Sequence, residues 1–319
     1  MSGIVNGFLK TYMLAYFLPS LLFVSLNIFG LIPSVIKYKF IIDSDFITSF
    51  QHQIFIILGM SAFIGFAFMS SASTLIKLFE GYLFSKIFIF ISFPLKKIQE
   101  FKRKRYIKRL ISIEQNIKKT RSRNLKQALR LEAEEIKAVM LMNFSLDIDD
   151  ILPTTFGNIF KAFENYPYAR YNIDSVLLWP RLINVIPAKY TDRIEEANNS
   201  VTFLVVSCFL FLLLAIECFL IFHFNWCNKS NVFFIKILAF SSLIFSFMFY
   251  RISLRAALNF GEVVKSCFDL FRHDLIQSFG IKRQLNLDEE REFWQKLRRF
   301  ILIGEGDPST EFQVKHQMN

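Results

Sequence analysis

Two ionisable residues, Glu217 and Lys236, lie inside long apolar stretches of the sequence. A charge within lipid is costly, so an acid and a base at such positions indicate either a functional site or a structural pair. Each lies five or six residues from the turn between the two stretches, which predicts a similar depth and a possible intramembrane ion pair. The competing interpretation is that these side chains extend toward the nearby membrane surface.

No pattern typical of catalysis or cofactor binding is present in the sequence. It lacks a Gly-rich phosphate loop with Lys, and it lacks the GxGxxG, HExxH and GxSxG motifs. The four cysteines have no CxxC spacing and the four histidines are scattered, which argues against a zinc site or a disulfide framework. We therefore predict that the protein is not an enzyme and that it uses no metal and no cofactor.

The densest group of charges is a basic run from Lys96 to Arg130, which contains fourteen Lys and Arg and two Glu. The net charge of the whole chain is +11, so the remainder is close to neutral. Such a run beside a membrane binds anionic lipid headgroups. The residues predicted to contact lipid or another polyanion are Lys96, Lys97, Lys102, Arg103, Lys104, Arg105, Lys108 and Arg109.

Nucleic acid is the alternative partner for the basic run, because positive charge alone gives non-specific affinity for phosphates. Only Phe101 and Tyr106 are interleaved with the charges, so a platform for stacking bases is not evident. The position of the run beside an apolar stretch accounts for its charge without a nucleic acid. Whether the run also binds one stays open.

Four apolar stretches, near residues 12–36, 54–76, 201–222 and 232–250, predict membrane-spanning helices. A bilayer core of about 30 Å requires about 20 apolar residues in a helix. The composition agrees, with 53% hydrophobic residues and 40 Phe. The first stretch contains Pro19, where we expect a kink and not a break.

Small residues recur at helical spacing in the second apolar stretch. Ser61 and Gly65 are four residues apart, as are Ala67 and Ser71. This spacing lets two helix backbones approach closely in lipid. The face could pack against the other spans of the same chain, or it could join copies of the chain into a homo-oligomer or line a pore.

The distribution of Lys and Arg predicts the orientation of the chain in its membrane. Basic residues are concentrated in the insert between the two pairs of spans and after Tyr250, so the insert and both termini are expected in the cytoplasm. The predicted fold class is an all-α integral membrane protein, multi-pass in the bacterial inner membrane. Its four transmembrane helices form two hairpins, with a helical cytoplasmic insert and C-terminal helices.

Four segments follow from this topology. Residues 1–95 form the first transmembrane hairpin with an interfacial segment at 81–95, for which a fifth span is the alternative. Residues 96–200 form a basic helical cytoplasmic domain, and 201–250 form the second hairpin. Residues 251–319 form a helical extension of the fourth span to Gly280, a last helix from about Asn286 to Gly304, and a disordered tail.

The insert is predicted to contain several helices. One or two long helices are expected over 95–152, with a break near 120–124. Thr154 or Thr155 can cap a short helix, and Asn172 can cap the next. We expect ion pairs such as Glu164 with Arg170 and Asp174 with Arg181. This element is either a small folded cap on the spans or a sensor surface for a partner or ligand.

The stretch FENYPYARYNIDSVLLWPRLINVIP, followed by a polar helix that leads into a span, resembles a pattern in poorly characterised bacterial multi-pass membrane proteins. The overall architecture is similar to the transmembrane effectors of anti-phage defence systems, such as those encoded beside retron reverse transcriptases. This second resemblance is one of type and not of motif. It implies a toxin that stays silent until infection and then perturbs or permeabilises the inner membrane, which causes abortive infection.

The resemblance to defence effectors also implies partners. These are the lipid bilayer, further copies of the chain and a cytoplasmic nucleoprotein regulator such as a reverse transcriptase complex. The competing interpretation of the sequence is a constitutive membrane transport or assembly component.

Overall fold

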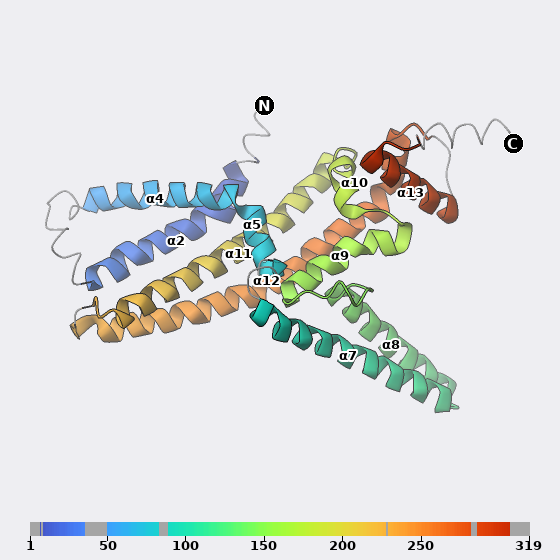
Figure 1. Cartoon of the computed structure of the whole chain (residues 1–319), viewed down its shortest axis with the longest axis horizontal. Coiled ribbons are helices and arrows are strands. Elements are labelled where there is room, and N and C mark those ends of the chain that lie inside the picture. Colours follow the sequence, from blue (N-terminus) through green and yellow to red (C-terminus); the bar gives the residue numbers. More distant parts are fainter. Residues whose placement is uncertain are drawn as a thin grey trace. The chain divides into compact units, whose positions relative to one another are not determined.

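The structure, a computed structural model, describes residues 7, 9–35, 50–82, 89–227, 229–281 and 286–306. These ranges are almost entirely helical, and their only β-type contact is an isolated bridge between Val35 and Cys227. Within them, four helices are long and apolar enough to cross a membrane: Leu9–Ser34, Gln51–Ser70, Ala188–His223 and Val232–Ser278. The chain therefore has the predicted all-α architecture of a membrane protein (Figure 1).

The chain divides into two compact units. Unit 1 comprises Met1–Lys77 and Glu195–Ala256, and unit 2 comprises Leu78–Ile194 and Ala257–Asn319. The two longest helices, α11 (Ala188–His223) and α12 (Val232–Ser278), each contribute residues to both units. Each unit therefore combines segments that are far apart in the sequence.

The first span of unit 1 stays helical on both sides of Pro19 but is not a uniform α-helix. It consists of η1 (Met13–Phe17), α2 (Leu18–Leu26), η2 (Asn27–Leu31) and η3 (Ile32–Ser34), and both η1 and η2 are π-helical turns. The Tyr12 hydroxyl donates a 2.7 Å hydrogen bond to the backbone oxygen of Ala62, on the second span. The two spans thus form the predicted hairpin.

The second span is shorter than the sequence predicts. The helix α4 (Phe50–Ser70) ends before Ser71, and α5 (Ala72–Glu80) is a separate helix, whereas we expected one helix to Ile76. The Ser71 hydroxyl donates a 2.7 Å hydrogen bond to the backbone oxygen of Ala67. Serine side chains that bond back in this way compete with the backbone and bend helices, which accounts for the interruption.

The second hairpin of unit 1 consists of the apolar parts of α11 and α12, joined through the short turn η5 (Lys229–Asn231). Aromatic rings of the two helices contact one another. The Phe211 ring lies 5.4 Å from that of Phe245 and 5.5 Å from that of Phe249. The Ser246 hydroxyl donates a 3.0 Å hydrogen bond to the backbone oxygen of Cys208, so a polar group in this apolar contact is satisfied.

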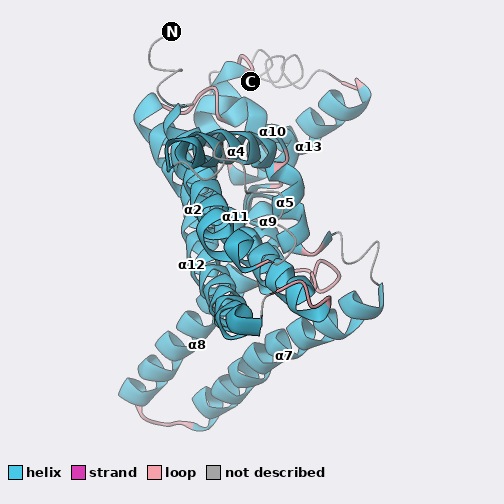
Figure 2. Ribbon diagram, turned by 90° about the vertical axis from the view of Figure 1, so that its left-hand side faces the viewer, coloured by secondary structure: helices cyan, strands magenta, loops and turns pink. Residues whose placement is uncertain are grey.

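A helical hairpin of α7 (Ile89–Lys119) and α8 (Arg123–Asn143) forms one part of unit 2 (Figures 1 and 2). The predicted break near 120–124 is confirmed, and Ser122 caps α8. Of the segment 81–95, which we expected at the membrane interface, residues 83–88 lie outside the described residues, and Ile89 already belongs to α7. Of the tail from Glu305, which we expected to be disordered, residues 307–319 also lie outside them.

Unit 2 also contains the shorter helices α9 (Thr155–Tyr171), α10 (Ser175–Leu182) and α13 (Leu287–Ile303). Thr154 caps α9 as predicted. Asn172 ends α9 in a left-handed conformation (φ 63°) and does not begin the next helix, which contradicts our expectation. Asp174 caps α10 instead, where its carboxylate accepts a 3.1 Å hydrogen bond from the Leu177 amide.

The last helix has both of the ends that the sequence predicts. The side chain of Asn286 accepts a hydrogen bond from the Glu289 amide, and the Glu289 carboxylate accepts one from the Asn286 amide, which is a complete capping box. Gly304 ends the helix with a φ of 73°, a conformation that favours glycine. Phe293, Trp294 and Leu297 form its buried face.

The C-terminal half of α12 is the helix against which α9 and α13 pack in unit 2. A Cβ atom at Gly261 would lie 2.7 Å from the Phe163 ring, so glycine permits the close approach of α9. The hydroxyls of Tyr166 and Tyr171 donate hydrogen bonds of 2.9 Å and 2.7 Å to the Asp269 carboxylate. The prediction that the fourth span continues as a helix almost to Gly280 is confirmed, and this continuation organises the unit.

An ion pair joins α12 to α13. The Arg272 guanidinium donates a 3.0 Å hydrogen bond to Glu290, whose carboxylate also accepts a 3.1 Å bond from the indole nitrogen of Trp294. Glu290 is almost completely buried, so both partners are needed to offset the loss of its hydration. The buried carboxylate of α13 is therefore paired with a cation of α12.

Replacing Thr154 tests how the start of α9 is held. Its hydroxyl donates to the backbone oxygens of Phe79 and Glu80, at 2.7 Å and 3.0 Å, and accepts from the Gly157 amide at 2.9 Å. We expect Thr154→Ala to destabilise the fold by about 1–2 kcal/mol. Thr154→Ser keeps the hydroxyl and serves as the control. Equal melting temperatures of the two variants in detergent would contradict this role.

Candidate functional site

The structure does not join the two ionisable residues of the apolar stretches. The Lys236 ammonium lies over the Phe222 ring, 4.9 Å from its centroid. One carboxylate oxygen of Glu217, Oε2, is buried without a hydrogen-bond partner. The possible ion pair between Glu217 and Lys236 is thus not formed, because the Lys236 ammonium lies over a ring and Glu217 Oε2 has no partner.

The predicted small-residue face has two different environments. Ser61 is buried, and a Cβ atom at Gly65 would lie 3.2 Å from the Cα atom of Phe17 in the first span. Ala67 and Ser71 are exposed. The first pair therefore serves the contact between the two spans of the same chain, while the second pair is available for other contacts.

The basic residues of α7 also differ in their surroundings. Arg103 is 8% exposed, and its guanidinium donates to the backbone oxygen of Leu146, so it is not free to contact lipid as we expected. Lys102 donates a 3.3 Å bond to the Thr155 hydroxyl. Arg109 forms a 3.0 Å ion pair with Glu132 of α8. Lys96 is partly buried, whereas Lys97, Lys104, Arg105 and Lys108 are exposed.

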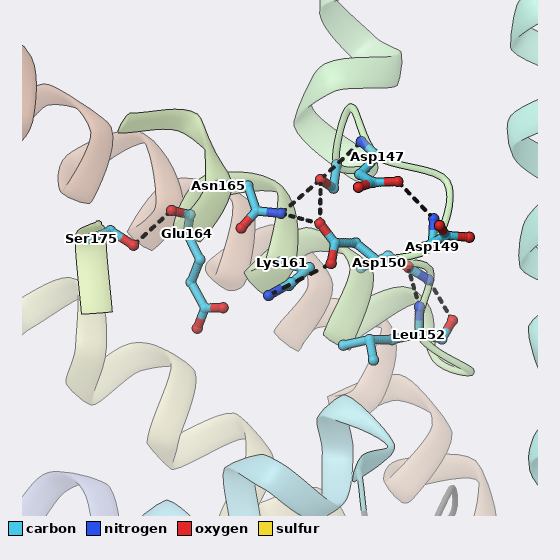
Figure 3. Close-up of polar contacts among 10 residues, drawn as sticks. Asp147, Asp149, Asp150, Leu152, Lys161, Glu164, Asn165 and Ser175 are labelled. Atoms are coloured by element: carbon cyan, nitrogen blue, oxygen red, sulfur yellow. Dashed lines mark hydrogen bonds and ion pairs between the residues drawn. The ribbon is translucent and has the colours of Figure 1, made fainter. Parts of the chain in front are cut away.

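A polar network that the sequence did not predict lies where the loop after α8 meets α9 (Figure 3). The Asn165 amide donates to the Ser145 hydroxyl at 2.8 Å and to the Asp150 carboxylate. The Ser145 hydroxyl donates to the same carboxylate at 3.2 Å, and the Lys161 ammonium lies 4.0 Å from it. The network fixes the loop against one face of α9, because Lys161 and Asn165 are one helical turn apart.

The Glu164 carboxyl group lies beside this network. Figure 3 shows its side chain between Lys161 and Ser175, and the Ser175 hydroxyl donates a 2.6 Å bond to the Glu164 backbone oxygen. Burial raises the pKa of the Glu164 carboxyl above its ordinary value. Lys161 partly opposes this effect, and the negative charge of Asp150 adds to it.

These residues border a cavity of about 540 Å³ in unit 2, which we call the polar groove. Its polar lining residues are Ser145, Asp147, Asp150, Lys161, Glu164, Asn165, Asp174, Ser175 and Arg298. Arg298 of α13 donates a 3.0 Å bond to Asp174, whereas we expected Asp174 to pair with Arg181. The groove is thus formed by the loop after α8, by α9, by the start of α10 and by α13.

The polar groove presents charged and polar groups that suit the binding of a ligand. It combines carboxylates with two cationic side chains, and its serines contact a carboxylate or a backbone oxygen, with no histidine beside them. In the described part of the chain, no group of three His, Cys, Asp or Glu side chains could hold a metal ion. A small ligand or peptide with groups of both charges is the class that this lining would recognise.

One other sequence expectation for this region is wrong, and Arg181 has a different partner from the expected Asp174. Glu164 was expected to pair with Arg170, but Arg170 lies over the Tyr166 ring, 5.1 Å from its centroid. The Arg181 guanidinium donates to the backbone oxygen of Leu177 within its own helix. Both pairs chosen by proximity in sequence therefore failed, and for Asp174 the actual partner comes from α13, far along the chain.

No family model, no curated protein and no solved structure matches this chain. The candidate sites therefore rest on the residues and their geometry alone.

Gly65 and Gly59 provide a matched pair of positions on α4. A side chain at Gly65 would meet the backbone of Phe17, whereas a Cβ atom at Gly59 meets nothing within 4 Å. We expect Gly65→Leu to destabilise the first hairpin by about 1–3 kcal/mol, as overpacking does, and Gly59→Leu to have little effect. Melting of both variants in detergent measures this. If only the oligomeric state changed, with stability intact, Gly65 would instead lie on an interface between copies.

Glu164→Gln should change how stability depends on pH. The folded state holds the Glu164 proton more tightly than the unfolded chain, because burial raises the pKa of this carboxyl group. The wild type therefore loses stability as pH rises from the ordinary range of Glu through the raised pKa. The Gln variant lacks this loss, so it should melt at a higher temperature above that range and at the same temperature below it.

The control for this pH series is Glu114→Gln, since Glu114 is exposed on α7. Its melting temperature should differ from that of the wild type by the same amount at every pH. If the difference in melting temperature between Glu164→Gln and the wild type were also the same at every pH, the burial of Glu164 would have no energetic consequence.

Proposed function

We propose that the protein is a bacterial inner-membrane effector, of the kind used in retron-type anti-phage defence. It acts by perturbing or permeabilising the membrane when its cytoplasmic part is triggered. The observation that supports this proposal is the continuity of α11 and α12, which run without interruption from apolar segments into unit 2. A helix shared by two units passes a displacement of one to the other.

The length of α12 supports such a role. At about 1.5 Å per residue its 47 residues extend roughly 70 Å, which is more than twice the hydrocarbon thickness of about 30 Å that one span requires. The part beyond the apolar segment bears the contacts of unit 2, among them Asp269 with the two tyrosines of α9. A change at α9 or α13 would therefore act directly on a helix of the span bundle.

The trigger in this proposal is a cytoplasmic regulator that binds the helical unit, for example a nucleoprotein complex that contains a reverse transcriptase. We place the contact with this regulator at the polar groove, because an ion pair from α13 and hydrogen bonds from the loop after α8 meet there. The proposed orientation places unit 2 and both termini in the cytoplasm. Copies of the chain would assemble through exposed small residues such as Ala67 and Ser71.

The test of the effector role is the membrane potential of living cells. We expect a voltage-sensitive dye to report loss of most of the potential during phage infection in cells that carry the gene with its neighbours, and after expression of the protein alone. Inserting two glycines between Ala256 and Ala257, where α12 passes from unit 1 to unit 2, should abolish the loss by breaking the helix. The variant protein must still be recovered in the membrane fraction.

The matched control inserts the same two glycines between Thr120 and Arg121, in the turn that already separates α7 from α8. This variant should retain the wild-type response. A potential that never changes with the wild type, in infected or uninfected cells, would overturn the effector proposal. A growth or transport defect of uninfected cells that lack the gene would then favour the alternative, a constitutive transport or assembly component.

A further inference from the structure

One side of α7 presents aromatic and basic residues together, and we call it the outer face. Its members recur every three or four residues, which places them in one stripe along the helix. They are Phe90, Phe93, Lys97, Phe101, Lys104, Arg105 and Lys108. Pro94 is also exposed on this side, Glu100 lies at the edge of the stripe and Glu114 lies beyond its end, so the charges of the outer face itself are all positive.

The opposite side of α7 is fixed against the rest of unit 2. Gln99 is 5% exposed, and its side-chain amide donates a 3.3 Å bond to the Thr155 hydroxyl. Arg103 bonds to the backbone of Leu146, and Tyr106 packs against Phe144 with ring centroids 6.4 Å apart. The helix therefore cannot turn about its axis to cover its outer face.

The phenylalanines of the outer face are exposed to an unusual degree. The exposed fraction is 94% for Phe90, 61% for Phe93 and 57% for Phe101. Each large apolar side chain left in water forgoes about 1.5–3 kcal/mol of burial. A row of three along a helix that is otherwise fixed indicates a surface that another apolar phase covers.

Two of the four cations of the outer face lie directly over its rings. The Lys97 ammonium is 4.4 Å from the centroid of the Phe93 ring, and the Arg105 guanidinium is 4.5 Å from that of Phe101. Each pair thus presents an aromatic ring and a positive charge at the same place. A bilayer surface offers the complementary arrangement, with acyl chains directly below anionic headgroups.

We propose that the outer face of α7 lies on an anionic lipid surface, with its phenylalanines at the level of the acyl chains and its cations on the phosphates. A nucleic acid fits this face less well. Stacking of bases needs free ring faces, but Lys97 and Arg105 occupy a face of the Phe93 and Phe101 rings. Tyr106, the other aromatic within the basic run, is packed inside the hairpin.

The full chain, reconstituted in lipid nanodiscs, tests the proposal. Phe101→Trp reports the environment of the outer face, and Leu131→Trp, at an exposed position of α8, is the control reporter. The discs contain acyl-brominated lipids, which quench only tryptophans that reach the acyl chains, and the signal of the native tryptophans is subtracted. We expect strong quenching of the Phe101→Trp reporter in discs with phosphatidylglycerol, weak quenching with phosphatidylcholine alone, and none for the control in either.

Charge variants then test the electrostatic part of the contact. Combining Phe101→Trp with Lys104→Gln and Lys108→Gln should weaken the docking equilibrium roughly fivefold for each charge removed. Lys118→Gln with Lys119→Gln removes the same charge from the exposed end of α7 and should leave quenching unchanged.

Two results would overturn the proposal. One is quenching of the Phe101→Trp reporter that equals that of the Leu131→Trp control, or that does not depend on the headgroup charge. The other is a reporter that ignores lipid but is shifted by single-stranded RNA or duplex DNA, which would assign the outer face to nucleic acid. Since the membrane potential does not enter this measurement, docking of α7 can fail while the proposed effector function stands, and the reverse also holds.

Discussion

Two tyrosine hydroxyls of α9 donate to one carboxylate of α12, and the arrangement of unit 2 depends on this contact. Bonds to a charged acceptor are stronger than those between neutral groups, and here both donors converge on Asp269. Burial, together with the bonds to Asp269, raises the pKa of Tyr166 and of Tyr171. The hydroxyls therefore keep their protons across the neutral range, and the attachment of α9 to α12 does not vary with ordinary changes of pH.

The basic run of α7 combines two roles that charge alone does not distinguish. Arg103 is directed inward, where it holds the loop that leads to α9 through the backbone of Leu146. Lys97 and Lys104 point away from the rest of the unit. The distinction arises from the helical period. Lys97 and Lys104 are seven residues apart and so share one face of the helix, whereas Arg103, six residues after Lys97, lies on another face. One segment therefore both stabilises the helical unit and provides a charged surface.

Features set by a few neighbouring residues were predictable from the sequence. The lengths of the apolar stretches predicted four spans, and Thr154, Asn286 and Gly304 marked helix ends because capping depends on local backbone geometry. Contacts between distant segments were not predictable. Asp174 pairs with Arg298, more than one hundred residues away, and Arg298 lines the polar groove only because α13 returns to that place. The interruption at Ser71 was missed because a serine in a small-residue stretch is compatible with a continuous helix.

The two π-helical turns of the first span have a consequence for its phase. A π turn contains one residue more than an α turn, so each one rotates all later side chains by about 100° about the helix axis. The side that this span presents to α4 is therefore set by the number of such insertions and not by a single hydrophobic repeat. Loss of one residue from either turn would leave the apolar character of the span unchanged and would redirect everything beyond that point.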